Sequence, residues 1–463
     1  MRTGTEGTVL SRAYTTVLRL RDRVRFAVGH APARIAIGVF AMATLVFTVL
    51  LMLPVASVDA TRTSLPDAFF TAVSAVTVTG LTTVNTGEHW SMFGQVVILV
   101  AIQTGALGVV TIALLLAMAV TRRLGVSGRV FAKENIGSGD VGRLLRVVVL
   151  TTFTIQAALA VFLVPAFIVA EGSFWQGLWH GGFYSISAFG NAGFTSHPDG
   201  LEAFAGNPFV LTPIALGVFV GSFGFPVFLN LIRVRWTRRR WTLHTKLTLY
   251  TTVILLVLGA AAWAGFEWAN PATVGGAPWW EKISNAFFAS TMMRSGGFAI
   301  IDMESSTATT MLLSDALMFV GGGSASTAGG IKVTTLAVLI LAIAAEAKGT
   351  RSTSVLGRRI PSSTLRLAIS VVFLGATLVL VAAGLLTIVS EAPLDRILFE
   401  VISAFATCGL SVGISSEVGS FGKYVLSALM LTGRIGPIVL ASALALRQRQ
   451  EAFSFPEERP IIG

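Results

Sequence analysis

Long apolar runs alternate with short apolar segments along most of this chain. The first long run covers residues 33–56 and the next covers 93–120. Between them, residues 67–76 form a short apolar segment, which rises only about 15 Å as a helix, about half the thickness of a bilayer core. The pattern predicts an outer membrane-spanning helix, a half-membrane helix and an inner spanning helix.

The same unit recurs along the chain. The expected outer helix, half-helix and inner helix of the later copies cover 144–170, 178–189 and 209–232; then 245–266, 281–292 and 309–345; then 363–390, 394–405 and 422–446. Each half-helix is followed by glycine and then Leu or Phe, at Gly80, Gly193, Gly297 and Gly409. Regular internal repetition of this kind predicts an all-α polytopic membrane protein with eight transmembrane helices around one central pore.

The chain is expected to consist of four repeats and the segments that connect them. The repeats cover 33–120, 144–232, 245–345 and 363–446. They are joined and flanked by a basic amino-terminal arm (1–32), three loops (121–143, 233–244 and 346–362) and a carboxyl-terminal tail (447–463).

The four glycine turns are candidate cation-binding elements. A chain that aims successive carbonyls at one point needs backbone angles that residues with a Cβ disfavour, and a ring of carbonyls can replace the hydration shell of a cation. The carboxyl end of each half-helix also favours a positive charge. Glycines that only let helices pack closely are the simpler alternative, but four in the same context favour a filter. Its expected residues are Thr77, Val78, Thr79, Gly80, Asn191, Ala192, Gly193, Ser295, Gly296, Gly297, Thr407, Cys408 and Gly409.

Composition supports a membrane protein and limits its chemistry. The chain is 54% hydrophobic and 12% charged, with a mean hydropathy of +0.77, outside the range of soluble domains. The lone cysteine, Cys408, excludes an intrachain disulfide and any multi-cysteine metal site. The histidines show no paired ligand spacing, so we expect packing roles for His30, His89, His180, His197 and His244.

The distribution of charge predicts the orientation of the chain. The formal net charge is +11, and basic residues cluster in the amino-terminal arm, in 122–133, 233–240 and 348–359, and near the carboxyl end. By the positive-inside tendency these segments and both termini are cytoplasmic, and the glycine turns enter the membrane from outside. The basic residues therefore indicate a lipid bilayer and not a nucleic acid as the partner.

The third inner helix is interrupted by a run of small residues. It contains Gly321, Gly322, Gly323, Ser324, Ser326, Thr327, Gly329 and Gly330. Each glycine costs roughly 1 kcal/mol in a helix relative to alanine, and irregular backbone at membrane depth occurs only in protein or beside a cavity. We expect a gate below the filter. A nucleotide-binding loop is the alternative, but the spacing before Lys332 does not fit GxxxxGK[ST] and no strand precedes it.

Lys332 and Arg434 are charged residues inside apolar runs. Such charges are costly and usually face a partner or a water-filled path. No acidic residue lies near Arg434 in the inner-helix runs, so we expect it to contact carbonyls and hydroxyls of the interrupted segment. A proton-coupled carrier would need carboxylates in the membrane as proton relays, and we expect none in the middle of a helix.

Residues 33–447 resemble the Trk/Ktr/HKT superfamily of potassium transporters. The resemblance is carried by TVTGL at 77, NAGF at 191, RSGGF at 294, TCGL at 407, QTGALG at 103, GGGSASTAGGIK at 321 and GRIGP at 433. The chain is most similar to the ion-conducting subunits of Ktr systems, because residues 1–32 leave no room for the two extra helices of the Trk branch. Gly296 stands where alanine is usual, and the sequence Gly-Ser-Phe-Gly at 221–224 replaces the usual Gly-Gly-Leu-Gly.

This resemblance implies a function and partners. It implies a potassium conduit in the cell membrane, with potassium at the filter glycines, a gating loop that contacts the arginine of GRIGP, no organic cofactor and no enzymatic activity. It also implies a homodimer regulated by a cytosolic ring of nucleotide-binding subunits of the KtrA type. A sodium-conducting member is the alternative, but serine at the first filter glycine marks sodium preference in the plant branch, and this chain has Gly80.

Overall fold

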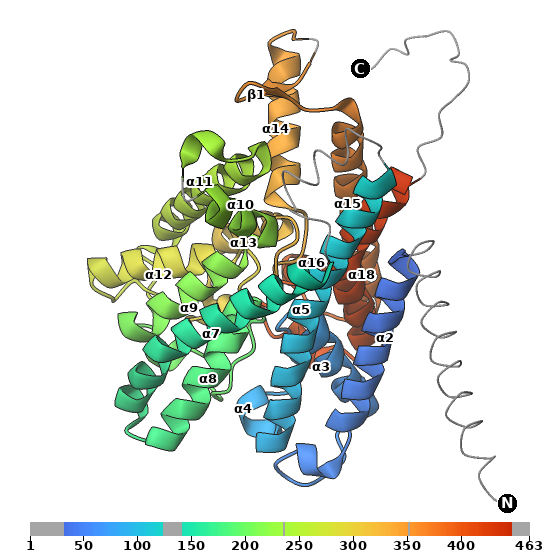
Figure 1. The fold of residues 1–463 in the computed structure, drawn as a ribbon. Helices are drawn as coiled ribbons and strands as arrows, with labels where there is room; N and C mark the ends of the chain where they lie inside the picture. Colours follow the sequence, from blue (N-terminus) through green and yellow to red (C-terminus); the bar gives the residue numbers. More distant parts are fainter. Residues whose placement is uncertain (1–31, 124–140, 235–236, 351, 447–463) are drawn as a thin grey trace, which may run out of the picture.

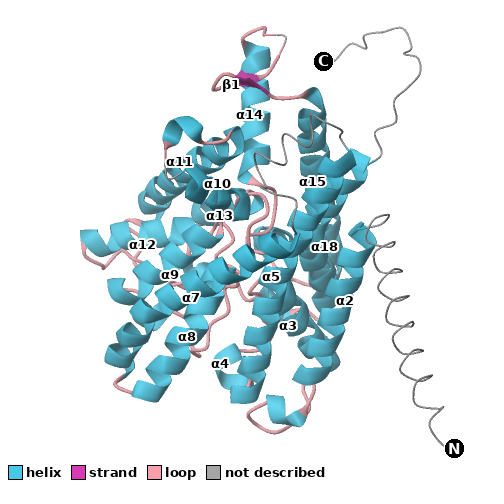
Figure 2. Ribbon diagram, viewed as in Figure 1, coloured by secondary structure: helices cyan, strands magenta, loops and turns pink. Residues whose placement is uncertain are grey.

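The computed structural model describes residues 32–123, 141–234, 237–350 and 352–446. Most of this part is helical (Figure 2). The strands within it are β1 (Ser354–Val355) and β2 (Arg358–Arg359), which pair as an antiparallel hairpin. Residues 1–31 of the expected arm, residues 124–140 of the loop 121–143, and the tail 447–463 lie outside the described residues.

The first repeat contains two long helices and a short one. They are α2 (Pro32–Leu51), α3 (Leu65–Thr77) and α5 (Met92–Arg123), with the single-turn α4 (Thr86–His89) before α5. Helix α3 begins where the Ser64 hydroxyl accepts a hydrogen bond from the backbone N–H of Asp67, an N-cap. It ends because Val78 adopts a left-handed conformation, which turns the chain.

The second repeat differs from the prediction. It contains α7 (Val141–Glu171), α8 (Phe174–Gly190), α9 (Pro208–Gly221) and α10 (Phe225–Val234). The expected continuous inner helix over 209–232 is wrong, because α9 and α10 meet at an angle of 91°. Gly224 has a φ of +86°, and a Cβ there would overlap the Ser324 carbonyl oxygen, so the break makes room for the segment that interrupts the third inner helix.

The third and fourth repeats follow the expected order. The third contains α11 (Leu243–Glu267), α12 (Trp279–Met292), α13 (Ala308–Phe319) and α14 (Val333–Ala347). The fourth contains α15 (Ser362–Val389), α16 (Leu394–Ala406), α17 (Ile414–Glu417) and α18 (Ser420–Leu446). Short 3-10 helices occupy Pro54–Ala56, Glu202–Phe204, Arg238–Arg240 and Met303–Ser305.

Several helices are apolar and long enough to cross a membrane. Among the described residues, length and composition identify four such spans, or five if the bent pair α9 and α10 counts as one. Helices α13 and α14 are each too short to span alone, since the segment between them interrupts the inner helix. The exact number of eight spans therefore stays a prediction.

The outer helices present apolar side chains to the surroundings. In α15, Phe373, Leu380 and Ile388 are 74%, 68% and 79% exposed, whereas most of α3 is buried. A soluble protein rarely leaves apolar surface of this kind uncovered, and a bilayer solvates it. The long helices surround the half-helices and their turns, as Figure 1 shows for α2, α5 and α18 around α3.

Candidate ion pathway

Each half-helix ends in a turn with unusual backbone angles. Val78, Asn191, Ser295 and Thr407 all have positive φ, between 45° and 79°, a conformation that disfavours residues with a Cβ. In every turn the glycine two residues later also has positive φ, at 98°, 68°, 76° and 102° for Gly80, Gly193, Gly297 and Gly409. The four turns therefore share one backbone pattern despite different side chains.

The four glycines lie next to one another in a closed ring. A Cβ added to Gly80 would lie 3.0 Å from the Gly193 Cα, and one added to Gly193 would lie 3.0 Å from the Gly297 Cα. A Cβ added to Gly297 or to Gly409 would lie 3.2 Å from the Cα of Gly409 or of Gly80, respectively. Segments more than 300 residues apart in sequence thus meet, and chain order matches the order around the ring.

Side chains on the half-helices hold the turns in place. The backbone N–H of Gly80 donates to the Ser74 hydroxyl at 3.1 Å, and that of Gly409 donates to the Ser403 hydroxyl at the same distance. In the second turn the Ser187 hydroxyl donates to the Phe194 carbonyl at 2.9 Å. The other side chains of the turns are packed inside protein: Thr77, Val78, Thr79, Asn191, Ala192, Ser295, Thr407 and Cys408 are all 0% exposed.

The segment between α13 and α14, which we call the 320–332 loop, lies against the second turn. The Thr327 hydroxyl is 3.2 Å from the Phe189 carbonyl oxygen, 3.2 Å from Asn191 Oδ1 and 3.0 Å from the Gly221 carbonyl oxygen. The loop also fills the bend of the second inner helix, where the N–H of Gly323 donates to the Ser222 carbonyl at 2.7 Å.

The same loop contacts the third and fourth turns. The backbone N–H of Gly329 donates to the Ser295 hydroxyl at 3.1 Å, and that hydroxyl in turn donates to the Thr407 carbonyl at 3.1 Å. A Cβ on Gly329 would overlap the Thr407 hydroxyl. The 320–332 loop therefore packs directly against three of the four turns and has no room there for a larger residue.

Two basic side chains bind carbonyl oxygens of this loop. Lys332 donates from Nζ to the carbonyls of Ala328 at 2.7 Å and Gly329 at 3.1 Å. Arg434, which is 3% exposed and lies on α18, donates from Nη1 to the Thr327 carbonyl. Within the part of the chain that the structure describes, neither forms an ion pair, and Arg434 Nε and Nη2 have no hydrogen-bond partner.

Two residues of the turns have contacts that the sequence did not indicate. The buried thiol of Cys408 lies 3.4 Å from the Met292 carbonyl oxygen, so it links the fourth turn to the third half-helix. Arg294, inside the third turn and 3% exposed, donates from Nη1 to the Thr252 carbonyl of α11 at 3.0 Å. A charged residue in an apolar segment was the signal that identified Lys332, and Arg294 in RSGGF shows the same signal.

The expectation that no carboxylate lies in the middle of a helix is wrong. Asp315 is inside α13, and Glu400, which is 0% exposed, is inside the half-helix α16. Glu400 accepts hydrogen bonds from the Ser411 hydroxyl at 2.9 Å and from the backbone N–H groups of Val412 and Ser415 at 3.2 Å. Glu400 therefore connects the half-helix α16 to the chain after the fourth turn. These hydrogen-bond donors offset the cost of burying the carboxylate, and they come close to it only in the folded chain.

The chain matches a known protein family over most of its length. The TrkH family profile, described as "Cation transport protein", matches residues 7–454. The chain is 34% identical to the Ktr system potassium uptake protein B of Bacillus subtilis, over 96% of this chain and 99% of that one. It is 33% identical to the potassium/sodium uptake protein NtpJ of Enterococcus hirae, over 97% and 100%.

The fold has a counterpart among solved structures. The potassium transporter TrkH from Vibrio parahaemolyticus matches with a TM-score of 0.69 at 18% identity, covering 88% of this chain and 84% of that one. This chain therefore has the same overall fold as that transporter. Its several long apolar helices indicate a multi-pass membrane protein. Together with the profile match over almost its whole length, these relatives show that the chain belongs to the TrkH family of cation transport proteins.

Proposed function

We propose that this protein takes up potassium through the centre of the ring formed by Gly80, Gly193, Gly297 and Gly409. The observation that carries the proposal is the closure of that ring by four turns with the same pattern of positive φ. The name of the relative from Bacillus subtilis, Ktr system potassium uptake protein B, supports potassium as the ion.

The proposed filter uses backbone and not side chains. The side chains of the turns are packed away in protein, so carbonyl oxygens are the groups left to replace the water around a cation. Each half-helix points its carboxyl end at the ring, and each such end carries about half a negative charge. Potassium is the transported ion here, and the proposal requires no organic cofactor in this chain.

The 320–332 loop is the proposed gate. It packs against three of the turns through Thr327 and Gly329, and Lys332 and Arg434 hold its carbonyls. A fixed guanidinium beside a narrow path repels a cation and also anchors the loop. In the proposed closed state the loop and Arg434 together block the path on the side of the ring away from the half-helices.

The remaining parts of the proposal concern assembly and orientation. A cytosolic ring of nucleotide-binding subunits of the KtrA type regulates the loop, and two copies of this chain form a homodimer, each with its own pore. The relative from Bacillus subtilis is named as part of a Ktr system, which supports such a regulatory partner. The basic segments and both termini face the cytoplasm, as the charge distribution favours.

Rubidium flux into proteoliposomes tests the proposal. Purified protein should admit rubidium, external potassium should compete with it at low concentration, and sodium should compete only weakly. Empty vesicles provide the background. The Arg366→Ala variant, changed at an exposed position of α15, is the matched protein control and should admit rubidium like the wild type. Absence of rubidium entry at verified protein incorporation would contradict the proposed conduit.

Sodium transport is the second candidate. The potassium/sodium uptake protein NtpJ is a relative at 33% identity over 97% of this chain. The same vesicles, tested with radioactive sodium in the absence of potassium, separate the two functions. Sodium entry as fast as rubidium entry would favour a conduit for both ions.

A further inference from the structure

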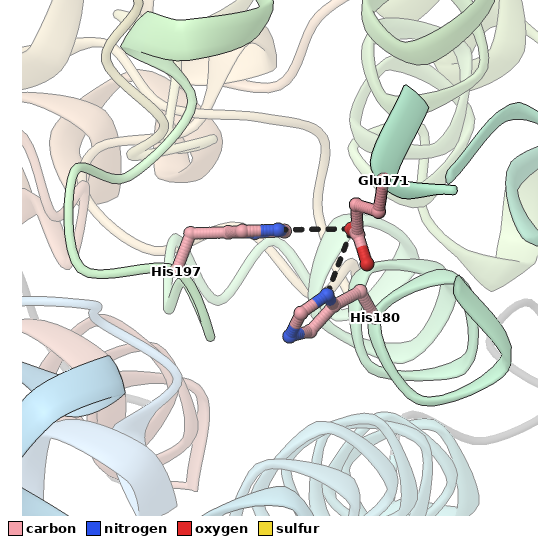
Figure 3. A group of neighbouring side chains, drawn as sticks. All are labelled: Glu171, His180 and His197. Atoms are coloured by element: carbon pink, nitrogen blue, oxygen red, sulfur yellow. Dashed lines mark hydrogen bonds and ion pairs between the residues drawn. The ribbon is translucent and has the colours of Figure 1, made fainter. Parts of the chain in front are cut away.

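Two histidines and a glutamate from separate segments meet near the start of α8 (Figure 3). Glu171 is the last residue of α7, His180 is in α8, and His197 follows Gly193 in the loop that leads to α9. His180 Nδ1 lies 2.8 Å from Glu171 Oε1, and His197 Nε2 lies 3.0 Å from the same oxygen. The three ligand atoms all lie within 4.8 Å of one another.

One carboxylate oxygen of the cluster forms no hydrogen bond among the described residues. Both rings approach a single oxygen of Glu171, while the other, Oε2, is buried without a partner among the described residues. The two rings lie 4.0 Å apart between centroids. Two protonated imidazoles at this separation would repel each other, and one carboxylate could not balance both charges.

We propose that Glu171, His180 and His197 bind a divalent transition metal of the Zn²⁺ class. Two imidazole nitrogens and a carboxylate oxygen are ligands that zinc takes in proteins, with a fourth position open to water. Tetrahedral ligands at about 2.0–2.1 Å from zinc lie about 3.3 Å from each other. The observed separations of 2.8 and 3.0 Å from the carboxylate oxygen are shorter than this value, and all three ligand atoms lie within 4.8 Å of one another, so small side-chain movements reach the zinc geometry.

The surroundings fit such a site. His197 Nδ1 lies 2.9 Å from the Tyr184 hydroxyl, so the ring can donate there and present Nε2 to the metal, as ligating histidines usually do. The His180, His197 and Glu171 side chains are 17%, 16% and 13% exposed, which leaves an opening for the ion. Potassium, magnesium and calcium prefer oxygen ligands, so the two nitrogens select against the transported ion.

A metal at this site would connect segments that are far apart in the sequence. It joins the corner between α7 and α8 to the loop after the second turn, and the next residue of that loop, Pro198, accepts a hydrogen bond from Asn85 Nδ2 at 2.7 Å. The bound ion therefore holds the corner between α7 and α8 to the loop after the second turn, and this loop contacts the segment that follows the first turn.

Zinc titration of the purified full-length protein tests this assignment. After removal of any histidine tag, calorimetry with Zn²⁺ should detect one site per chain, and Zn²⁺ should raise the melting temperature because it binds the folded state. Glu171→Gln, His180→Ala and His197→Ala should each weaken Zn²⁺ binding at least tenfold. His89→Ala is the matched control, since His89 is a part-buried histidine outside the cluster whose ring hydrogen-bonds the Thr63 hydroxyl, and it should bind Zn²⁺ like the wild type.

The outcomes separate a metal site from a hydrogen-bonded cluster. Wild-type protein that binds no Zn²⁺, or variants that bind it as tightly as wild type does, would overturn the proposal. If His197→Ala does not fold, Glu171→Gln and His180→Ala decide, because the first keeps the shape of the side chain and the second keeps the contact of His197 with Tyr184. Rubidium flux is measured separately, so a failed conduit does not affect this result.

Discussion

At the scale of single residues, the candidate pathway depends on glycines that have no room for a Cβ. At Gly80 an added Cβ would overlap the Ala192 carbonyl oxygen, and at Gly409 it would overlap that of Thr79. Both residues also have φ near 100°, which strains any L residue. A substitution at either position must move one turn relative to the others. It therefore changes the geometry of the ring and leaves the helices folded.

Gly80→Ser should reduce discrimination between potassium and sodium about tenfold, which corresponds to about 1.4 kcal/mol. The first turn must shift, so one of four carbonyl contributions is displaced while the surrounding helices stay folded. The measurement is rubidium flux with potassium and sodium as competitors. Gly182→Ser is the control, since a Cβ there meets nothing within 4 Å. A potassium to sodium ratio equal to that of wild type would refute the filter assignment.

Arg434→Ala should increase rubidium flux, and more so without the regulatory partner than with it. Removing the guanidinium removes a repulsion of at most about 4 kcal/mol at 4 Å in an effective dielectric near 20, and it also frees the Thr327 carbonyl. Arg434→Lys should give an intermediate flux because the charge is kept. Arg366→Ala, at an exposed position of α15, should leave the flux unchanged. Equal flux for Arg434→Ala and wild type would reduce this arginine to a structural anchor.

At the scale of elements, two inner helices are broken, and the two breaks pack together. The second inner helix bends by 91° between Gly221 and Phe225, and the third is interrupted from Val320 to Lys332. The N–H of Phe225 donates to the Ala325 carbonyl at 3.1 Å, so each break satisfies backbone groups exposed by the other. Irregular backbone at membrane depth needs such internal partners.

Deletion of residues 323–327 should increase flux in the absence of any cytosolic partner. The shortened loop loses the Thr327 contacts to the second turn and to Arg434, so it no longer closes the path. Rubidium flux at equal protein incorporation is the measurement. Deletion of Leu356 and Gly357, in the hairpin between β1 and β2, controls for the effect of shortening a loop. A well-folded deletion variant that conducts less than wild type would favour a transport role for the loop over a gate.

At the scale of the whole molecule, the apolar surface and the charge distribution together predict how the chain is oriented in the membrane. Apolar residues cover the outer helices, while the hairpin between α14 and α15 carries exposed Arg358 and Arg359. The loop at which the half-helix α16 begins carries Glu391. Under the positive-inside tendency we expect the hairpin on the cytoplasmic side and Glu391 on the outer side.

Cysteine labelling in intact cells should report this orientation. The chain offers a convenient background because its one cysteine, Cys408, is 0% exposed, so wild type should not react. A membrane-impermeant maleimide should label Glu391→Cys from outside, whereas Arg358→Cys should react only after the cells are opened. Labelling in the reverse pattern would invert the topology and move the proposed gate to the outer side of the ring.

The sequence alone determined the features that depend on local chemistry. Half-helices expected at 67–76 and 394–405 are present as Leu65–Thr77 and Leu394–Ala406, because apolar length and a following turn are properties of a short segment. The glycine turns and the interruption near Gly321 were predicted for the same reason, since backbone freedom and helix propensity belong to each residue. The family resemblance rests on these same segments.

Only the tertiary structure decided which distant groups meet. The bend at Gly224 comes from packing against Ser324, a residue of another repeat. Glu400 could be buried because Ser411 and Ser415 return to it, and Glu171 meets histidines 9 and 26 residues away that have no common spacing motif. The physical reason is that propensity acts along the chain, whereas contact between separate segments depends on how helices pack, which short-range sequence patterns do not specify.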